Sequence, residues 1–132
     1  MRPMFEVGVA GKFWAEHRLR GDFGPATQRH GHDYRVEIAV RGAKLREDGT
    51  LCDMAVLQQS LDRCLSPFDG TDLDELSDFD GRNTTAEVLA DWVADALTPS
   101  LRELGLDQLE ARVFESPDAW ASSSRTLPAA DS

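Results

Sequence analysis

The chain has 132 residues, of which 41% are hydrophobic and 29% are charged, a composition typical of a single soluble globular domain. Its formal net charge of -10 gives a surface that on average repels polyanions, so nucleic acid is not an expected partner. No apolar run approaches the roughly 18 residues of a membrane span, and the amino terminus lacks the apolar core of a secretory signal, so we expect a cytoplasmic protein with no membrane partner.

Two strands are expected in the first third of the chain. In residues 5–15 apolar side chains recur at nearly alternate positions, as in a half-buried strand. Residues 32–41 alternate more clearly, with one apolar face formed by Tyr34, Val36, Ile38 and Val40. We expect an antiparallel hairpin whose connection, residues 18–29, is long and irregular, and long loops inside compact domains are usually functional.

Two helices are expected next, after a turn at residues 47–49. Residues 54–65 have apolar positions at helical spacing, and Pro67 should end that helix because the residue before a proline disfavours the helical conformation. In the second helix Thr84 and Glu87 fit a capping box. Its apolar stripe runs through residue 97, and Pro99 is the expected break.

The last strands are expected at residues 109–115 and 119–125, forming a second hairpin. The predicted fold is therefore α+β, with a four-stranded antiparallel sheet and two helices on one face in the order ββααββ. Residues 1–125 would form this single domain. Residues 126–132 are small and polar enough to be a disordered tail.

The two cysteines, Cys52 and Cys64, are neither a CxxC pair nor a disulfide framework. We place Cys52 in a strand before Asp53 and Cys64 on the apolar side of the first helix, where both serve packing. A local basic cluster lies around the histidine segment, formed by Arg18, Arg20, Arg29 and Arg35. These arginines either guide an anionic substrate or pair with neighbouring acids.

All three histidines of the chain lie within sixteen residues: His17, His30 and His32. Neutral imidazole is the commonest zinc ligand, and three histidines with an open fourth position form a catalytic site. Side chains at i and i+2 of a strand share a face, so His30 and His32 should point the same way, with Gly31 leaving room around the metal. If the first two strands pair, His17 reaches the same site. We therefore expect Zn²⁺.

Over residues 5–125 the sequence resembles the 6-pyruvoyl-tetrahydropterin synthase and 6-carboxy-tetrahydropterin synthase family. Five segments carry the resemblance: residues 13–19 are similar to F-x-A-x-H-x-L, 30–34 to H-G-H-N-Y, 49–54 to G-x-v-x-D-F, 84–87 to P-T-x-E, and 114–116 to a strand-end E-T.

The resemblance implies the tunnelling fold, whose sheets join between subunits into an oligomeric barrel. It implies a homo-hexamer, formed by two trimers, with active sites at subunit interfaces. It makes His17, His30 and His32 the zinc ligands. Glu115 would anchor a pterin, since one carboxylate accepts two parallel hydrogen bonds from the ring. Thr85 would add a second contact at the rim of the pocket.

The sequence departs from the family at its two proton carriers. The family's catalytic cysteine precedes the first histidine of H-G-H by four residues, where this chain has Ala26. The family's catalytic histidine follows an aspartate after the first helix, and here Asp69 is followed by Gly70. Proton transfer would then pass to Asp69 or to another acid of this region, namely Asp22, Glu16 or Asp33, or to a zinc-bound water.

Three functions fit these residues. The first is a zinc-dependent lyase acting on a pterin, such as dihydroneopterin triphosphate, with altered or weak activity. The second is a zinc enzyme of a specialised biosynthetic pathway that acts on a non-pterin carbonyl substrate. The third is a non-catalytic oligomeric binding protein with structural zinc, which would need Asp22 or Glu16 as a fourth ligand.

Overall fold

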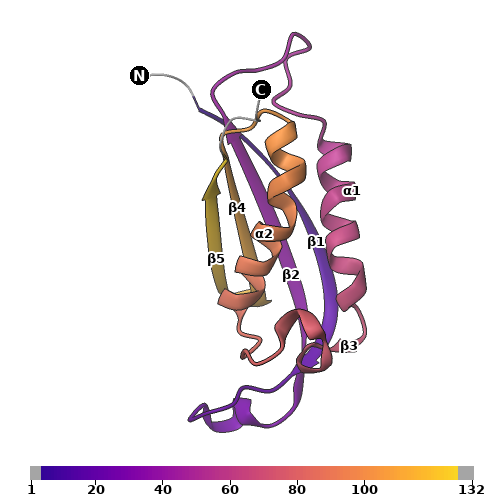
Figure 1. Ribbon diagram of the computed structural model, residues 1–132, viewed down its shortest axis with the longest axis vertical. Coiled ribbons are helices and arrows are strands. Elements are labelled where there is room, and N and C mark those ends of the chain that lie inside the picture. Colours follow the sequence, from indigo (N-terminus) through magenta and orange to yellow (C-terminus); the bar gives the residue numbers. More distant parts are fainter. Residues whose placement is uncertain (1–3, 128–132) are drawn as a thin grey trace.

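The computed structural model describes residues 4–127 and has the expected α+β architecture, with two helices packed on one face of a sheet (Figure 1). The helices and main strands are β1 (Phe5–His17), β2 (His30–Gly42), α1 (Met54–Leu65), α2 (Ala86–Glu103), β4 (Gln108–Ser116) and β5 (Ala119–Thr126). Four short 3-10 helices lie in the connections: η1 (Gly24–Thr27), η2 (Ser66–Phe68), η3 (Leu73–Glu75) and η4 (Ser77–Phe79). The four long strands are antiparallel, as predicted.

The first hairpin is longer than the sequence pattern indicated. Strands β1 and β2 pair without interruption from Phe5↔Gly42 to His17↔His30. Both strands therefore extend to the histidines, beyond the apolar alternation that predicted them, because backbone pairing continues where the side chains become polar. This extension places His17 and His30 directly opposite each other.

A fifth, two-residue strand, β3 (Thr71–Asp72), adds to the predicted sheet, which has the order β3-β1-β2-β4-β5. It runs parallel to β1 and pairs Thr71 with Ala15. Just before it, the Trp14 amide donates to Oδ1 of Asp69 over 3.0 Å, and the Gly70 amide donates to the Trp14 carbonyl over 2.7 Å. A strand this short has no alternation pattern, so the sequence did not reveal it.

The core lies between the helices and one face of the sheet. Helix α1 packs over β1, and α2 packs over β4 and β5 (Figure 1). From α1, Leu57, Leu61 and Leu65 are buried, and the Gln58 side chain donates to the Ala10 carbonyl over 2.9 Å. The helix bounds match the prediction at both ends, because its amphipathic spacing and the following proline are local signals.

Helix α2 differs from the prediction at its start and at its end. Its cap is Thr85, whose hydroxyl accepts from the Val88 amide over 3.2 Å, rather than Thr84. The helix also continues through Pro99 to Glu103, so the predicted break is wrong. Burial of Leu97 and Leu101, at 3% and 1% exposed, anchors the turns on both sides of the proline. Gly105, with φ +74°, follows the helix as expected.

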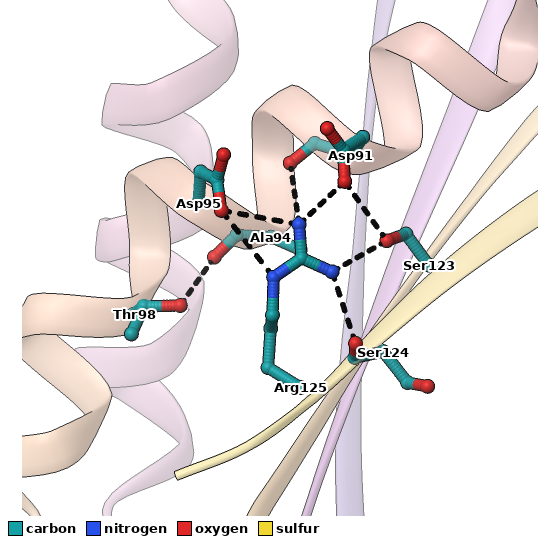
Figure 2. Close-up of polar contacts among 7 residues, drawn as sticks. All are labelled: Asp91, Ala94, Asp95, Thr98, Ser123, Ser124 and Arg125. Carbon is teal, nitrogen blue, oxygen red and sulfur yellow. Dashed lines mark hydrogen bonds and ion pairs between the residues drawn. The ribbon is translucent and has the colours of Figure 1, made fainter.

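An arginine from β5 fastens this strand to α2 (Figure 2). The Arg125 guanidinium donates to the carboxylates of Asp91 and Asp95, at 2.5 and 3.1 Å from Nη2. Its Nη1 also donates to Ser123 Oγ over 2.6 Å and to the Ser124 carbonyl over 2.9 Å. The hydrogen bond from Arg125 lowers the pKa of Asp91 below its ordinary value.

The structure also corrects the predicted start of the tail and the predicted setting of Cys52. Thr126 ends β5 and Leu127 is buried, so these first two residues of the expected tail belong to the fold, while residues 128–132 lie outside the described part. Cys52 is buried in a bend rather than a strand, and Asp53 caps α1 through the Ala55 amide. Neither α1 nor α2 is long and apolar enough to cross a membrane.

Candidate metal centre

The three histidines converge at the end of the first hairpin, as the sequence predicted. His17 faces His30 across the strand pair, and His32 follows two residues along β2 on the same face. The ring centroids are 4.6 Å apart for His17 and His30, 5.1 Å for His17 and His32, and 4.8 Å for His30 and His32. One ligand nitrogen from each ring lies within 4.8 Å of the others, which is a spacing that a single cation can bridge.

Hydrogen bonds at the ring Nδ1 atoms determine the tautomers of two of these histidines. Nδ1 of His17 lies 2.8 Å from the Thr84 carbonyl, and Nδ1 of His30 lies 2.7 Å from the Gln28 carbonyl. A carbonyl oxygen can only accept, so each Nδ1 carries a hydrogen, and in the neutral ring Nε2 then holds the lone pair. Nε2 of His17 is buried and has no hydrogen-bond partner in the described structure. An orphaned basic nitrogen beside two other imidazoles suits a metal ligand.

The surroundings keep His32 in its neutral form. Burial lowers the pKa of His32, and proximity to His17 and His30 lowers it further. The Glu115 carboxylate and a hydrogen bond to the Glu115 backbone act in the opposite direction. The net decrease favours the neutral imidazole, which is the form that binds metal. Three imidazole side chains fit zinc, whose preferred ligands are nitrogen and sulfur.

Gly31 has a different role from the one expected. It lies between the two β2 histidines in sequence, so its side of the strand is the opposite face of the sheet. A Cβ atom at Gly31 would lie 2.5 Å from Cζ2 of Trp14, whose indole covers this position. Glycine is therefore required for close packing against Trp14, and it creates no space on the histidine face.

A pocket of about 360 Å³ contains both predicted substrate residues, Glu115 and Thr85. It is also lined by two exposed aromatic residues, Phe23 and Trp120, which are 46% and 55% exposed. The sequence analysis did not select these two residues. An isolated tryptophan in the strand Ala119–Thr126, which is otherwise rich in alanine and serine, was the available signal. The pocket borders the metal centre through Glu115, which lies close enough to His32 to affect the pKa of that ring.

The acids proposed as proton carriers occupy different places. Glu16 is adjacent to His17 in β1 and points to the opposite face, where its carboxylate lies 2.7 Å from Nε of Arg29. Asp33 likewise alternates with the two β2 histidines. Asp69 uses Oδ1 to accept from the Trp14 amide at the β1 edge, while Oδ2 accepts no hydrogen bond within residues 4–127. Of these three acids, Asp69 alone lies outside strands β1 and β2, and its Oδ2 is available.

The cysteines are packing residues, as expected. Both are free thiols. Burial raises the pKa of Cys64 to about 11, and burial also raises the pKa of Cys52. Thiols with raised pKa values are poor nucleophiles at neutral pH.

Within residues 4–127, two arginines of the basic cluster pair with neighbouring acids, and the other two do not. Arg29 pairs with Glu16, and Arg35 pairs with Glu37 over 3.0 Å. Arg18 and Arg20 instead line a pocket of about 180 Å³ together with Arg82. The side chains of these three arginines form no ion pair in the described residues, since every salt bridge there involves other cations. They provide a positive region beside the histidines on an acidic protein.

Comparison with known proteins finds relatives over nearly the whole chain. The sequence model of the 6-pyruvoyl tetrahydropterin synthase family matches residues 6–126. An Archaeoglobus fulgidus protein with the provisional name 6-carboxy-5,6,7,8-tetrahydropterin synthase is 28% identical over 116 residues, covering 87% of this chain and 91% of its own. The 6-pyruvoyl tetrahydrobiopterin synthase of Dictyostelium discoideum is 27% identical over 103 residues, covering 69% and 76%.

Solved structures show the same fold. Caenorhabditis elegans 6-pyruvoyl tetrahydropterin synthase superposes with a TM-score of 0.80 at 22% identity, covering 94% of this chain and 97% of its own. A variant of Plasmodium vivax 6-pyruvoyltetrahydropterin synthase, in which a catalytic glutamate is replaced by alanine, superposes with a TM-score of 0.79 at 18% identity. The match covers 95% of this chain and 99% of that chain. These likenesses confirm the predicted fold class.

Proposed function

Because this chain belongs to the 6-pyruvoyl tetrahydropterin synthase family, we propose that it is a zinc-dependent, lyase-type enzyme that acts on a pterin. One observation carries the proposal: three imidazoles converge on a point next to a pocket that is lined by Glu115, Phe23 and Trp120. The histidines would hold the metal, and the pocket would hold the ring of the substrate.

His17, His30 and His32 would be the zinc ligands. Bound zinc would supply Lewis-acid chemistry to oxygen atoms of the substrate side chain. The chain itself contributes rigidity, because two paired strands carry the histidines and two Nδ1 atoms are fixed by carbonyl oxygens. Within residues 4–127 no carboxylate joins the histidine group, which favours an open fourth position over a structural site.

Glu115 would bind the pterin ring through paired hydrogen bonds from the ring N–H and amino groups. Phe23 and Trp120, which line the same pocket as Thr85, would supply apolar surface on which a flat heterocycle can stack. The unpaired guanidinium groups of Arg18, Arg20 and Arg82 would attract an anionic substrate such as dihydroneopterin triphosphate.

Proton transfer is where this chain would differ from its family. Ala26 and Gly70 stand where the resemblance leads us to expect a cysteine and a histidine, so altered or weak synthase activity is expected. We assign the proton-carrying role to Asp69, whose Oδ2 is available. The catalytic glutamate described for the Plasmodium vivax enzyme supports the use of a carboxylate in this fold.

A homo-hexamer would complete the site. Both outer strands, β5 on one side and most of β1 on the other, have an unpaired edge in the described chain. Edge pairing between copies would bring the β1 edge of one copy, with Asp69, beside β5 and Trp120 of the next. Asp69 and the pterin pocket would then belong to one composite site.

Replacement of both proton carriers also favours a second candidate, a zinc enzyme of a specialised biosynthetic pathway acting on a non-pterin carbonyl substrate. The two candidates differ in what the pocket binds. Titration calorimetry of the zinc-loaded protein with pterins, beside a screen of small carbonyl compounds, separates them.

The test of the proposal combines metal analysis with binding. We expect one zinc per chain in the purified protein and its loss in His30→Ala. Glu115→Gln should weaken pterin binding by at least about tenfold, because a neutral amide loses the paired charge-assisted hydrogen bonds. Glu103→Gln, which changes an exposed acid at the far end of α2, serves as the matched control. Equal pterin affinity in wild type and Glu115→Gln would exclude the pterin assignment.

A further inference from the structure

We infer that Thr84 and Asp74 are positioning residues for the metal centre, forming a hydrogen-bonded relay that holds His17 in the tautomer and orientation for metal binding. The inference rests on the proposed function, because it assigns a supporting role around the proposed zinc ligands. The sequence analysis selected Thr84 as a helix cap and did not select Asp74.

The first link joins Thr84 to the histidine. Nδ1 of His17 lies 2.8 Å from the Thr84 carbonyl oxygen and 3.1 Å from the Thr84 hydroxyl. Both side chains are buried, at 1% and 0% exposed, so water does not compete for these hydrogen bonds. The Nδ1 hydrogen is shared between two oxygens of one residue, which restricts rotation of the ring.

The second link joins Thr84 to a carboxylate. The Thr84 hydroxyl lies 3.0 Å from Oδ1 of Asp74 and must donate, because an ionised carboxylate only accepts. Its single hydrogen is then used, so towards His17 the hydroxyl oxygen can only accept. The donor order is therefore fixed from His17 to Thr84 to Asp74. In the neutral His17 ring this order leaves the lone pair on Nε2, the nitrogen that is free to bind a metal.

Asp74 is itself held in place from two sides. Its Oδ2 accepts from the Arg18 amide over 2.8 Å, and its own amide donates to Oδ1 of Asp72 over 3.0 Å. The carboxylate therefore bridges the residue after His17 and the segment that leads to α2. A carboxylate connected to a ligand histidine in this way orients the ring and raises the basicity of its free nitrogen.

A purely local role for Thr84 does not account for these contacts. The α2 cap is Thr85, and the Thr84 hydroxyl binds no amide of the helix. A fully buried hydroxyl needs partners, and its partners here are His17 and Asp74.

The experiment measures zinc affinity by competition with a chromophoric chelator, together with the visible absorption spectrum of the Co²⁺-loaded protein. Thr84→Val removes the hydroxyl while keeping the shape of the side chain, and it should weaken zinc binding by about 10–100-fold. Thr84→Ser should bind zinc within about threefold of wild type, because serine keeps the hydroxyl that contacts His17 and Asp74. Asp74→Asn, at the surface, should weaken binding and shift the Co²⁺ bands.

Matched controls separate the relay from general stability. Thr98→Val removes a hydroxyl that donates to the Ala94 carbonyl within α2. Asp78→Asn changes an exposed acid of η4. Neither should alter zinc affinity. If Thr84→Val does not fold, Asp74→Asn and the Co²⁺ spectrum still test the relay.

Imidazole ¹⁵N chemical shifts of the metal-free wild type give a readout independent of zinc, and we expect His17 to carry its hydrogen on Nδ1. Wild-type zinc affinity and an unchanged Co²⁺ spectrum in Thr84→Val, or a hydrogen on Nε2 of His17, would overturn the relay. Absence of metal binding in wild type, with the hydrogen on Nδ1, would instead overturn the proposed function and leave the hydrogen-bond order established.

Discussion

At the scale of single residues, the site depends on which face of a strand each side chain occupies. His17 and His32 point towards the helices, whereas Glu16 and Gly31, their neighbours in sequence, belong to the opposite face. The same alternation places the Trp14 indole over Gly31. Adjacent residues in the most informative motif of this chain therefore have unrelated roles.

Gly31→Ala tests the packing of Trp14. The new Cβ would lie 2.5 Å from the indole, so the ring must shift, and we expect the free energy of unfolding to fall by about 1–3 kcal/mol. Urea denaturation measures this change. Zinc content should not change, because the clash lies on the other face of the sheet. In a Trp14→Val background the same substitution should cost much less, and an equal cost in both backgrounds would contradict the contact.

At the scale of elements, α2 links the core to the site. Its amino-terminal end supplies Thr85 to the pocket, immediately after Thr84 contacts His17. Its middle is tied to β5 by Arg125 (Figure 2). Pro99 costs the helix one hydrogen bond, since proline has no N–H for the carbonyl four residues earlier, yet buried leucines on both sides keep the helix continuous.

Arg125→Gln tests this connection through its pH dependence. The pKa of Asp91 is lowered in the folded protein, so the ion pair stabilises the fold above about pH 4, the unfolded value, and this contribution is lost as the pH falls through the lowered pKa. Half of the Asp91 side chain is exposed, at 50%, so screening limits the expected loss at neutral pH to about 0.5–1 kcal/mol.

Thermal unfolding at pH 7 and at pH 3 measures the difference between wild type and Arg125→Gln. The difference should decrease at the lower pH and in high salt. Asp78→Asn, which changes an exposed acid whose side chain forms no ion pair in the described structure, is the control. A difference that is independent of pH would show that Arg125 acts through packing alone.

At the scale of the whole molecule, the sheet formed by residues 4–127 has two largely open edges and an exposed face opposite the helices. That face carries alternating charges paired within one chain, such as Arg41 with Glu6 and Glu110. An eight-residue edge strand with exposed Trp120 is the kind of surface that proteins cover by pairing with another copy. The hexamer proposed above would cover these edges.

Light scattering after size exclusion tests the assembly, and we expect a particle of six copies of the 14.6 kDa chain. Along β5, successive backbone amides point alternately towards β4 and towards the free edge. One of the two variants Ala121→Pro and Ser122→Pro therefore removes a backbone hydrogen bond to β4. The other removes an amide that points outwards. The variant that keeps its thermal stability should lose the assembly. A wild-type monomer at all concentrations would contradict the proposal.

Local sequence predicted those structural features whose residue pattern lies within a single helix or strand. Helical spacing and a proline gave both ends of α1, alternation gave the two hairpins, and the spacing of His30 and His32 placed both rings on one face. Resemblance to the family then identified Glu115 and Thr85, which do share a pocket.

Tertiary structure decided what joins distant segments. Thr84 meets His17 across 67 residues of sequence, and Asp69 meets Trp14 across 55. The contact of Trp14 with Gly31, the two-residue strand β3 and the aromatic side chains of the pocket likewise depend on which backbones become neighbours. No periodicity within a segment encodes such contacts, because their partners are specified only when the sheet and helices have packed.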